Sequence, residues 1–136
     1  MNRETTIKSF KDLKIWQRSI VLVERIYLAT KEFPKEELYG LTSQMRRCAV
    51  SIPSNISEGF SRGHRKEYVQ FLSISLGSCA ELTTQLEIAT RLRYLDEQRL
   101  QELKGELDEI SRMTMGLIKK IRSVQPVIDS PLTTND

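Results

Sequence analysis

Residues 100–121, LQELKGELDEISRMTMGLIKKI, decide the fold class. Their apolar side chains recur every three or four residues, close to a heptad, and most positions between them are charged or small. A stripe with this spacing lies along one side of an α-helix, so the stretch predicts a long helix that packs against other helices. The stripe consists of Leu100, Leu103, Leu107, Ile110, Met113, Leu117 and Ile121.

The N-terminal part predicts a second helix. Ser9 and Asp12 have the spacing of a capping box, and Phe33-Pro34 ends the pattern because the residue before proline avoids the helical region. The apolar residues between them occupy two faces. One face carries Leu13, Trp16, Ile20, Val23 and Tyr27, and the other carries Ile15, Leu22, Ile26 and Ala29. We expect Trp16 and Ile20 to be buried. Because one bundle core covers only one face, the second predicts self-association.

Two further helices are expected over 35–58 and 64–93. Pro53 predicts a kink near Ala49 in the first of them, and Gly59 is placed to serve as its C-terminal cap. Asp96 is expected to cap the helix that follows. Short connections force antiparallel neighbours, so the sequence predicts an all-α, antiparallel up-down-up-down four-helix bundle over residues 1–122, followed by a loose tail over 123–136. A chain of 136 residues, 39% hydrophobic and 29% charged, is long enough for one such core.

Residues for catalysis are scarce. His64 is the only histidine, and no glycine-rich phosphate loop is present. Cys48 and Cys79 fall in apolar helical stretches, where two buried free thiols are favoured over a disulfide, although a disulfide stays open. We therefore expect no enzymatic activity, no metal and no cofactor. Without an apolar signal core or a long apolar run, we expect a cytoplasmic protein that does not enter membranes.

Polar residues also follow helical spacing on the two middle helices. Where the two stripes meet, a buried carboxylate such as Glu58 or Glu81 would need Arg46 or Arg47 as its partner. An internal hydrogen-bond network is the favoured interpretation. A ligand or catalytic site built from Asn55, Glu58 and Glu81 and a subunit interface are the alternatives. The predicted network consists of Arg47, Ser51, Asn55, Glu58, Ser78 and Glu81.

The predicted topology gathers positive charge at one end of the bundle. The start of the first helix, the end of the second, the start of the third and the end of the fourth share this end, which we call the basic pole. Its cations are Lys8, Lys11, Lys14, Arg62, Arg65, Lys66, Lys119, Lys120 and Arg122. They are candidates for binding nucleic-acid phosphates, and an ordinary solvated surface is the alternative. The other end is the mixed-charge pole, and the net charge of the chain is only +3. Its cations and acids are Lys31, Lys35, Arg91, Arg93, Arg99, Glu32, Glu36, Glu37, Asp96, Glu97 and Glu102.

Four stretches resemble a known family. They are FKDLKIWQ (10–17), YGL (39–41) with Gln44, Arg46 and Arg47, SIPSNISEGFSR (51–62) and FLSISLGSCAELTTQL (71–86). The chain resembles the four-helix-bundle family of proteins encoded within intervening sequences of bacterial large-subunit ribosomal RNA genes. It is also similar to the accessory variability determinant of diversity-generating retroelements. The motif positions that match are Ser51, Asn55, Glu58, Gly59, Gly77, Ser78 and Glu81.

The resemblance implies a ring-like homopentamer without enzymatic activity, whose best-described relative binds nucleic acid and a partner polymerase. The expected function is therefore a non-catalytic oligomeric binding module, associated with RNA, DNA or a nucleic-acid-processing protein. The alternative is a protein–protein interaction scaffold with no nucleic-acid role.

Overall fold

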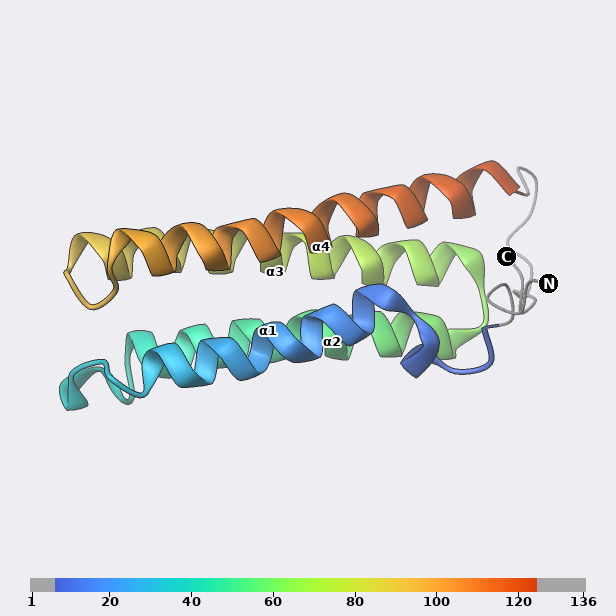
Figure 1. The fold of residues 1–136 in the computed structure, drawn as a ribbon. Coiled ribbons are helices and arrows are strands. Elements are labelled where there is room, and N and C mark those ends of the chain that lie inside the picture. The colour runs from blue at the N-terminus through green and yellow to red at the C-terminus, as the bar shows by residue number, and fades with distance from the viewer. Residues whose placement is uncertain (1–6, 125–136) are drawn as a thin grey trace.

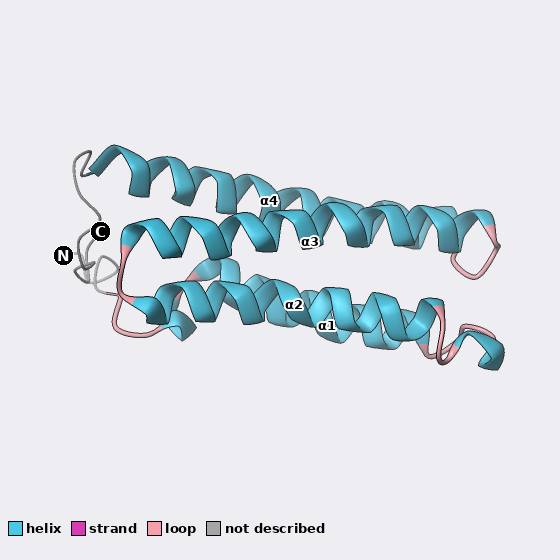
Figure 2. Cartoon of the chain, turned by 180° about the vertical axis from the view of Figure 1, so that it is seen from behind, coloured by secondary structure: helices cyan, strands magenta, loops and turns pink. Residues whose placement is uncertain are grey.

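The computed structural model describes residues 7–124, which form four long α-helices and two short 3₁₀ helices (Figure 1). Figure 2 shows the same helices from behind, and no strand occurs within this part of the chain. The all-α class and the four helices are therefore confirmed. The elements are η2 (Phe10–Asp12), α1 (Lys14–Thr30), η3 (Lys35–Glu37), α2 (Leu41–Arg62), α3 (Arg65–Arg91) and α4 (Glu97–Val124). The predicted tail over 123–136 lies almost wholly outside the described residues.

The capping box at Ser9 is confirmed, but it caps a 3₁₀ turn and not the long helix. The backbone N–H of Lys11 donates to Ser9 Oγ at 3.1 Å, and the N–H of Ser9 donates to Asp12 Oδ2 at 3.1 Å. Leu13 then adopts an extended conformation, so α1 begins only at Lys14. This break folds Phe10 back onto α1, where its ring centroid lies 5.4 Å from that of Trp16.

Only one of the two apolar faces of α1 lies in the core. Ile15, Leu22 and Ile26 are buried, whereas Trp16 and Ile20 are half-buried, which corrects their predicted burial. The buried face also contains two hydroxyl residues, Ser19 and Thr30, which donate to carbonyls one turn earlier in α1. A count of apolar residues underestimates the buried part of this face because helical hydroxyls can be satisfied by their own backbone.

The two glycines at the end of α2 have different roles from those predicted. The helix continues through Gly59 to Arg62, and Gly63 provides the C-terminal cap with a φ of 81°. A left-handed residue at this position is favourable for glycine because it has no Cβ. At Gly59 a Cβ would lie only 2.7 Å from Cβ of Phe71. Gly59 is therefore needed for the close approach of α2 and α3.

The start of α2 is also later than predicted, since η3 precedes it. Pro53 is buried inside α2, and the kink near Ala49 stays a prediction. Arg46 extends back from α2 to the end of α1, donating through Nε to Thr30 Oγ1 at 2.9 Å with its guanidinium 4.6 Å from the ring centroid of Tyr27. It thus supplies positive charge at the C-terminus of α1, where the helix dipole favours cations.

The connection between α3 and α4 follows the expected boundaries. The N–H of Tyr94 donates to the carbonyl of Ala89, and that of Arg93 to Thr90, with Arg93 in the left-handed region at a φ of 68°. Asp96 caps α4 through a 2.7 Å bond from the N–H of Arg99, which confirms that prediction.

The apolar stripe of α4 shifts by one position along the helix. Leu100, Leu103, Leu107 and Ile110 are buried as predicted. Thr114 and Ile118 then replace Met113 and Leu117, which are only half-buried. A straight helix drifts relative to a seven-residue repeat, so the inward position moves along the sequence. No helix of residues 7–124 combines the length and the apolar character that a membrane span requires.

Candidate nucleic-acid interface

The basic pole is one end of the folded bundle. In Figure 1 the start of α1, the junction of α2 and α3, and the end of α4 all lie at the same end. Among its nine cations, eight have exposed side chains and Arg65 is half-buried.

Ion pairing leaves most of this positive charge uncompensated. Arg62 pairs with Glu58 at 3.1 Å, and its guanidinium lies 5.1 Å from the ring centroid of Phe71. Arg65 and Lys66 each have interaction partners of their own. Within residues 7–124, no ion pair is formed by Lys8, Lys11, Lys14, Lys119, Lys120 or Arg122.

The acids near this pole, Asp12, Glu58 and Glu67, are fewer than its nine cations. The carboxylate of Asp12 accepts the N–H groups of Lys8 and Ser9, and that of Glu58 faces Arg62. Lys119, Lys120 and Arg122 have a local reason to be where they are, because cations at the end of α4 complement the helix dipole. Lys14, at the first position of α1, is placed against the dipole of that helix, so helix stability does not explain it.

At the mixed-charge pole, the carboxylate of Glu37 accepts two hydrogen bonds from neighbouring parts of the chain. Tyr94 donates from its hydroxyl to Glu37 Oε2 at 2.9 Å, and the N–H of Leu41 donates to Oε1 of the same residue at 3.0 Å. These hydrogen bonds, that of the Leu41 amide first, lower the pKa of Glu37 below its ordinary value. Glu37 therefore serves to join η3, the start of α2 and the α3–α4 connection.

The polar stripes of α2 and α3 meet through small side chains. Ser51 Oγ lies 2.6 Å from Ser78 Oγ, and Asn55 Nδ2 donates to the carbonyl of Ser51 at 2.8 Å. Cys48 Sγ lies 3.1 Å from the carbonyl oxygen of Ser78. Ser75 donates to the carbonyl of Ile52 at 2.9 Å. Hydroxyls on each helix thus satisfy groups of the other along one interface.

The predicted carboxylate–arginine pairs of this network are wrong. Glu58 and Glu81 are both exposed, so neither needs a buried cation. Arg46 binds the end of α1, and Arg47 Nη2 donates to Ser43 Oγ at 3.4 Å. Helical spacing predicted on which side of α2 and α3 these residues lie. It did not predict that the long glutamate side chains at the edge of the interface extend into solvent, whereas the short serine side chains stay within it.

Both cysteines are buried free thiols, which confirms the favoured prediction, and Cys48 lies at this interface. Burial, followed by the nearby carboxylate of Glu81, raises the pKa of Cys48 to about 12. Burial also raises the pKa of Cys79. A thiol that keeps its proton is a poor nucleophile. In the described part of the chain, no three histidine, cysteine or acidic side chains gather closely enough to hold a metal.

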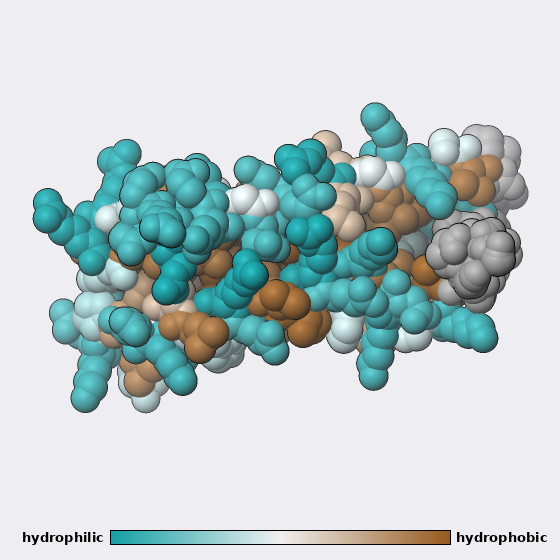
Figure 3. Space-filling view, in the orientation of Figure 1, coloured by the Kyte–Doolittle hydropathy of each residue, from teal (hydrophilic) through white to brown (hydrophobic). Residues whose placement is uncertain are grey.

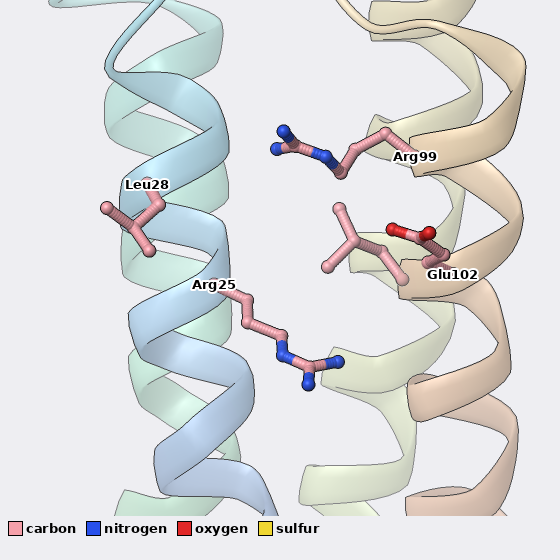
Figure 4. A pocket seen from close by; sticks show the side chains of 5 residues that line it. Arg25, Leu28, Arg99 and Glu102 are labelled. Carbon is pink, nitrogen blue, oxygen red and sulfur yellow. The ribbon is translucent and has the colours of Figure 1, made fainter.

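Two hollows on the surface were not predicted. The α1/α2 groove, of about 300 Å³, begins at Phe10 beside the basic pole. It is lined by Phe10, Trp16, Ile20, Val23, Val50, Pro53, Ser54 and Ser57. The α1/α4 cleft, of about 400 Å³, is lined by Arg25, Leu28, Arg99, Glu102 and Leu103. Figure 4 shows Arg25 and Arg99 extending into the cleft from opposite helices.

The groove had one signal in the sequence, the second apolar face of α1. The α2 side of the groove includes Val50 and Pro53, which lie beside the buried stripe of α2. The sequence pattern did not predict that they line a groove. Apolar side chains also break the hydrophilic surface elsewhere (Figure 3). The most exposed of those on helices are Leu28 at 61%, Met115 at 59% and Ile74 at 51%.

The chain resembles known proteins in fold and in sequence. A crystal structure of a protein of unknown function from the S23 ribosomal protein family of Bacteroides thetaiotaomicron is similar in fold, with a TM-score of 0.70 and 22% identity. The likeness covers 77% of this chain and 98% of that one. No curated protein matches. The family model described as 23S rRNA-intervening sequence protein matches residues 11–116. The chain therefore belongs to the family of 23S rRNA-intervening sequence proteins.

Proposed function

We propose that this protein is a non-catalytic, oligomeric binding module that holds RNA or DNA by its phosphates at the basic pole. The observation that carries the proposal is the set of six exposed cations at one end of the bundle without ion pairs among the described residues. Cations that stay unpaired are available to replace the counterions of a nucleic acid.

Self-association is the second part of the proposal. The outer face of α3 exposes Ile74 and Ile88, at 51% and 43%, on the same side of the helix as Gly77. No described atom lies within 4 Å of where a Cβ of Gly77 would be, so another backbone has room to approach there. Exposed apolar side chains around a glycine favour a helix–helix contact with a second copy. The resemblance noted above makes five subunits the expected number.

Assembly would strengthen phosphate binding. In a cyclic ring whose bundles run along the symmetry axis, every basic pole lies on the same face. Several weak sites on one face then engage a strand together, and overall affinity rises without any new contact. A salt-dependent interaction with little sequence preference is the expected behaviour, because phosphates carry no sequence information.

The experiment is a titration of RNA and DNA oligonucleotides at about 50 and 200 mM salt. The test variant combines Lys11→Glu, Lys119→Glu and Lys120→Glu, three exposed residues of the basic pole. Its matched control combines Lys31→Glu, Lys35→Glu and Arg91→Glu, which make the same charge change at the mixed-charge pole. We expect at least about a tenfold loss of affinity in the test variant and little loss in the control.

A protein–protein scaffold is the alternative function. It is favoured by the exposed side chains of the mixed-charge pole, where Tyr39 is 93% exposed and Leu38 and Leu92 about half exposed. Absence of nucleic-acid binding at low salt, or equal losses in the two triple variants, would reject the phosphate-binding proposal in favour of this one. Light scattering that gives a monomer mass at micromolar concentration would reject self-association.

A further inference from the structure

The α1/α2 groove opens at the basic pole. Phe10 belongs to η2, directly between Ser9 and the exposed Lys11, and Trp16 is the third residue of α1. The groove extends along α1 as far as Val23. At 1.5 Å per residue, the distance from Lys14 to Val23 is about 14 Å. The groove therefore occupies the part of the bundle next to the phosphate-binding cations.

Its lining is aromatic at the pole and aliphatic farther in. The rings of Phe10 and Trp16 are half-buried, inclined at 58°, with centroids 5.4 Å apart. Ile20, Val23 and Val50 form the remaining apolar wall. Hydrogen-bonding groups among the lining side chains are few, namely the hydroxyls of Ser54 and Ser57 and the indole N–H of Trp16. Such a surface suits a flat, apolar-faced group with polar edges.

The electrostatic setting favours an occupant attached to an anion. Lys8 and Lys11 flank Phe10 and are exposed. The neighbouring acid, Asp12, accepts two backbone N–H groups and keeps its negative charge, so two lysines face one carboxylate here. A nucleotide combines a flat base with a phosphate, and a groove of about 300 Å³ has room for one base. Aromatic side chains within a basic surface are the usual platform for unpaired bases.

We propose that the α1/α2 groove stacks an unpaired base of a single-stranded nucleic acid whose phosphates lie on the basic pole. This inference rests on the proposed function and adds a preference to it. A paired base is stacked inside a duplex and cannot enter the groove, whereas a single strand places its bases freely. The protein should therefore prefer single strands over duplexes of the same charge.

Trp16 is the only tryptophan of the chain, so its fluorescence reports directly on the groove. The probes are a short thymidine DNA strand, a uridine RNA strand of the same length, an abasic DNA strand with the same phosphates, and a duplex. We expect base-containing single strands to quench Trp16, with the RNA and DNA strands showing which sugar is preferred. The abasic strand should bind without quenching, and the duplex should quench much less.

Two matched pairs of variants sharpen the test. Phe10→Leu removes an aromatic ring from the groove but keeps Trp16, and Tyr39→Leu removes an exposed ring from the opposite pole. Val50→Glu places an anion in the groove, and Val21→Glu places one on another surface of α1 at similar exposure, 39% against 43%. We expect Phe10→Leu and Val50→Glu each to weaken base-containing strands by roughly 5- to 100-fold, with Tyr39→Leu and Val21→Glu near the wild-type affinity.

The outcomes separate this inference from the proposed function. If no strand binds, abasic included, the phosphate-binding proposal fails and this inference fails with it. If the abasic and thymidine strands bind equally and neither quenches Trp16, the base-stacking inference alone is overturned. A Trp16 emission that changes on dilution of the protein alone would overturn it as well, since a second copy would then occupy the groove. Far-ultraviolet circular dichroism confirms that each variant is folded.

Discussion

The side of the bundle between α2 and α3 and the side between α1 and α4 are packed by different kinds of side chain. Between α2 and α3 the contacts are short and made by small residues, as in the 2.6 Å approach of the Ser51 and Ser78 hydroxyls. Between α1 and α4 the contacts are made by long ones, since Arg25 reaches Glu106 at 3.4 Å across the edge of the α1/α4 cleft. Small residues bring two helices together, whereas long ones span the distance that separates them.

The two sides therefore differ in how far water can reach between the helices. The α2–α3 side holds the buried Cys48, whose Sγ lies 3.1 Å from the carbonyl oxygen of Ser78. The α1–α4 side leaves a hollow of about 400 Å³ bordered by ion pairs, which water and salt can reach. Five experiments test the contrast, and they follow from the largest expected effect to the smallest.

Thiol reactivity should differ most between the two sides. In a Cys79→Ala variant, Cys48 is the remaining thiol, and its pKa of about 12 lies well above the value of 9.0 for an ordinary thiol. Its thiolate fraction near neutral pH is then about a thousandfold lower than in the unfolded chain. We expect iodoacetamide to modify Cys48 rapidly only in denaturant. A cysteine introduced by Leu28→Cys in the α1/α4 cleft should react in the native protein.

The same shift gives a pH dependence. The folded protein keeps the Cys48 proton at pH values where the unfolded thiol loses it, so this contribution to stability is complete below about pH 9 and declines as pH rises toward 12. Rapid modification of native Cys48 would show that the α2–α3 side is open to solvent. The same conclusion would follow if the free energy of unfolding between about pH 9 and 12 were the same with Cys48 as in a Cys48→Ala variant.

Replacing glycine by alanine should lower stability where two helices are in close contact and raise it on an open helix surface. Gly59→Ala places a methyl group 2.7 Å from Cβ of Phe71, and we expect it to destabilise the fold by about 1–3 kcal/mol. Gly105→Ala on α4 meets no described atom within 4 Å and should stabilise by about 0.5–1 kcal/mol through helix propensity. Urea denaturation measures both. Equal effects of the two substitutions would contradict the close approach at Gly59.

The hydroxyl pair between α2 and α3 should make a moderate contribution. Ser51→Ala leaves Ser78 without its hydrogen-bond partner across the interface, and we expect a loss of about 1 kcal/mol. The double variant Ser51→Ala with Ser78→Ala should lose less than the sum of the single variants, because the two hydroxyls serve each other. Additive losses in this cycle would mean that the pair does not interact in solution.

The ion pairs on the α1–α4 side should contribute least. Glu106 pairs with Arg25 at 3.4 Å and Arg18 at 3.8 Å, but both arginines are about half exposed. We expect Glu106→Gln to cost less than about 1 kcal/mol, with the difference vanishing at high salt. Thermal unfolding at low and high salt makes the measurement. A salt-independent loss of stability larger than that of Ser51→Ala would show that the α1–α4 ion pairs contribute more than the α2–α3 hydroxyl pair.

Much of the fold followed from local patterns. The Asp96 cap and the apolar stripe of Leu100, Leu103 and Leu107 appear as predicted, because each depends on residues within a turn or two. The Ser9 capping box also forms, but it caps η2 and not α1. The basic pole also followed from chain direction, since helix ends joined by short connections must lie together. Whether that pole binds nucleic acid stays a prediction.

The predictions were wrong where the sequence offers two alternatives that local patterns do not distinguish. The face of α1 with Trp16 and the face with Leu22 are both apolar, and only packing against α2 and α4 placed Leu22 inside. Glu58 has helical spacing relative to Ser51 and Asn55, yet it extends to Arg62 at the surface. Gly59 and Gly63 are both plausible caps, and the nearby Phe71 decided which of them lies within the helix.

The sequence by itself therefore determined the number of helices, the Asp96 cap, the approximate extent of each helix and the charge at each pole. Periodicity, capping and charge are properties of neighbouring residues, and they hold whatever the helix packs against. The tertiary structure decided which apolar face of α1 was buried, where α2 and α3 came close, and where the α1/α2 groove and the α1/α4 cleft remained. These features depend on the distance between helices, which is set by side-chain volumes contributed from both sides of each interface.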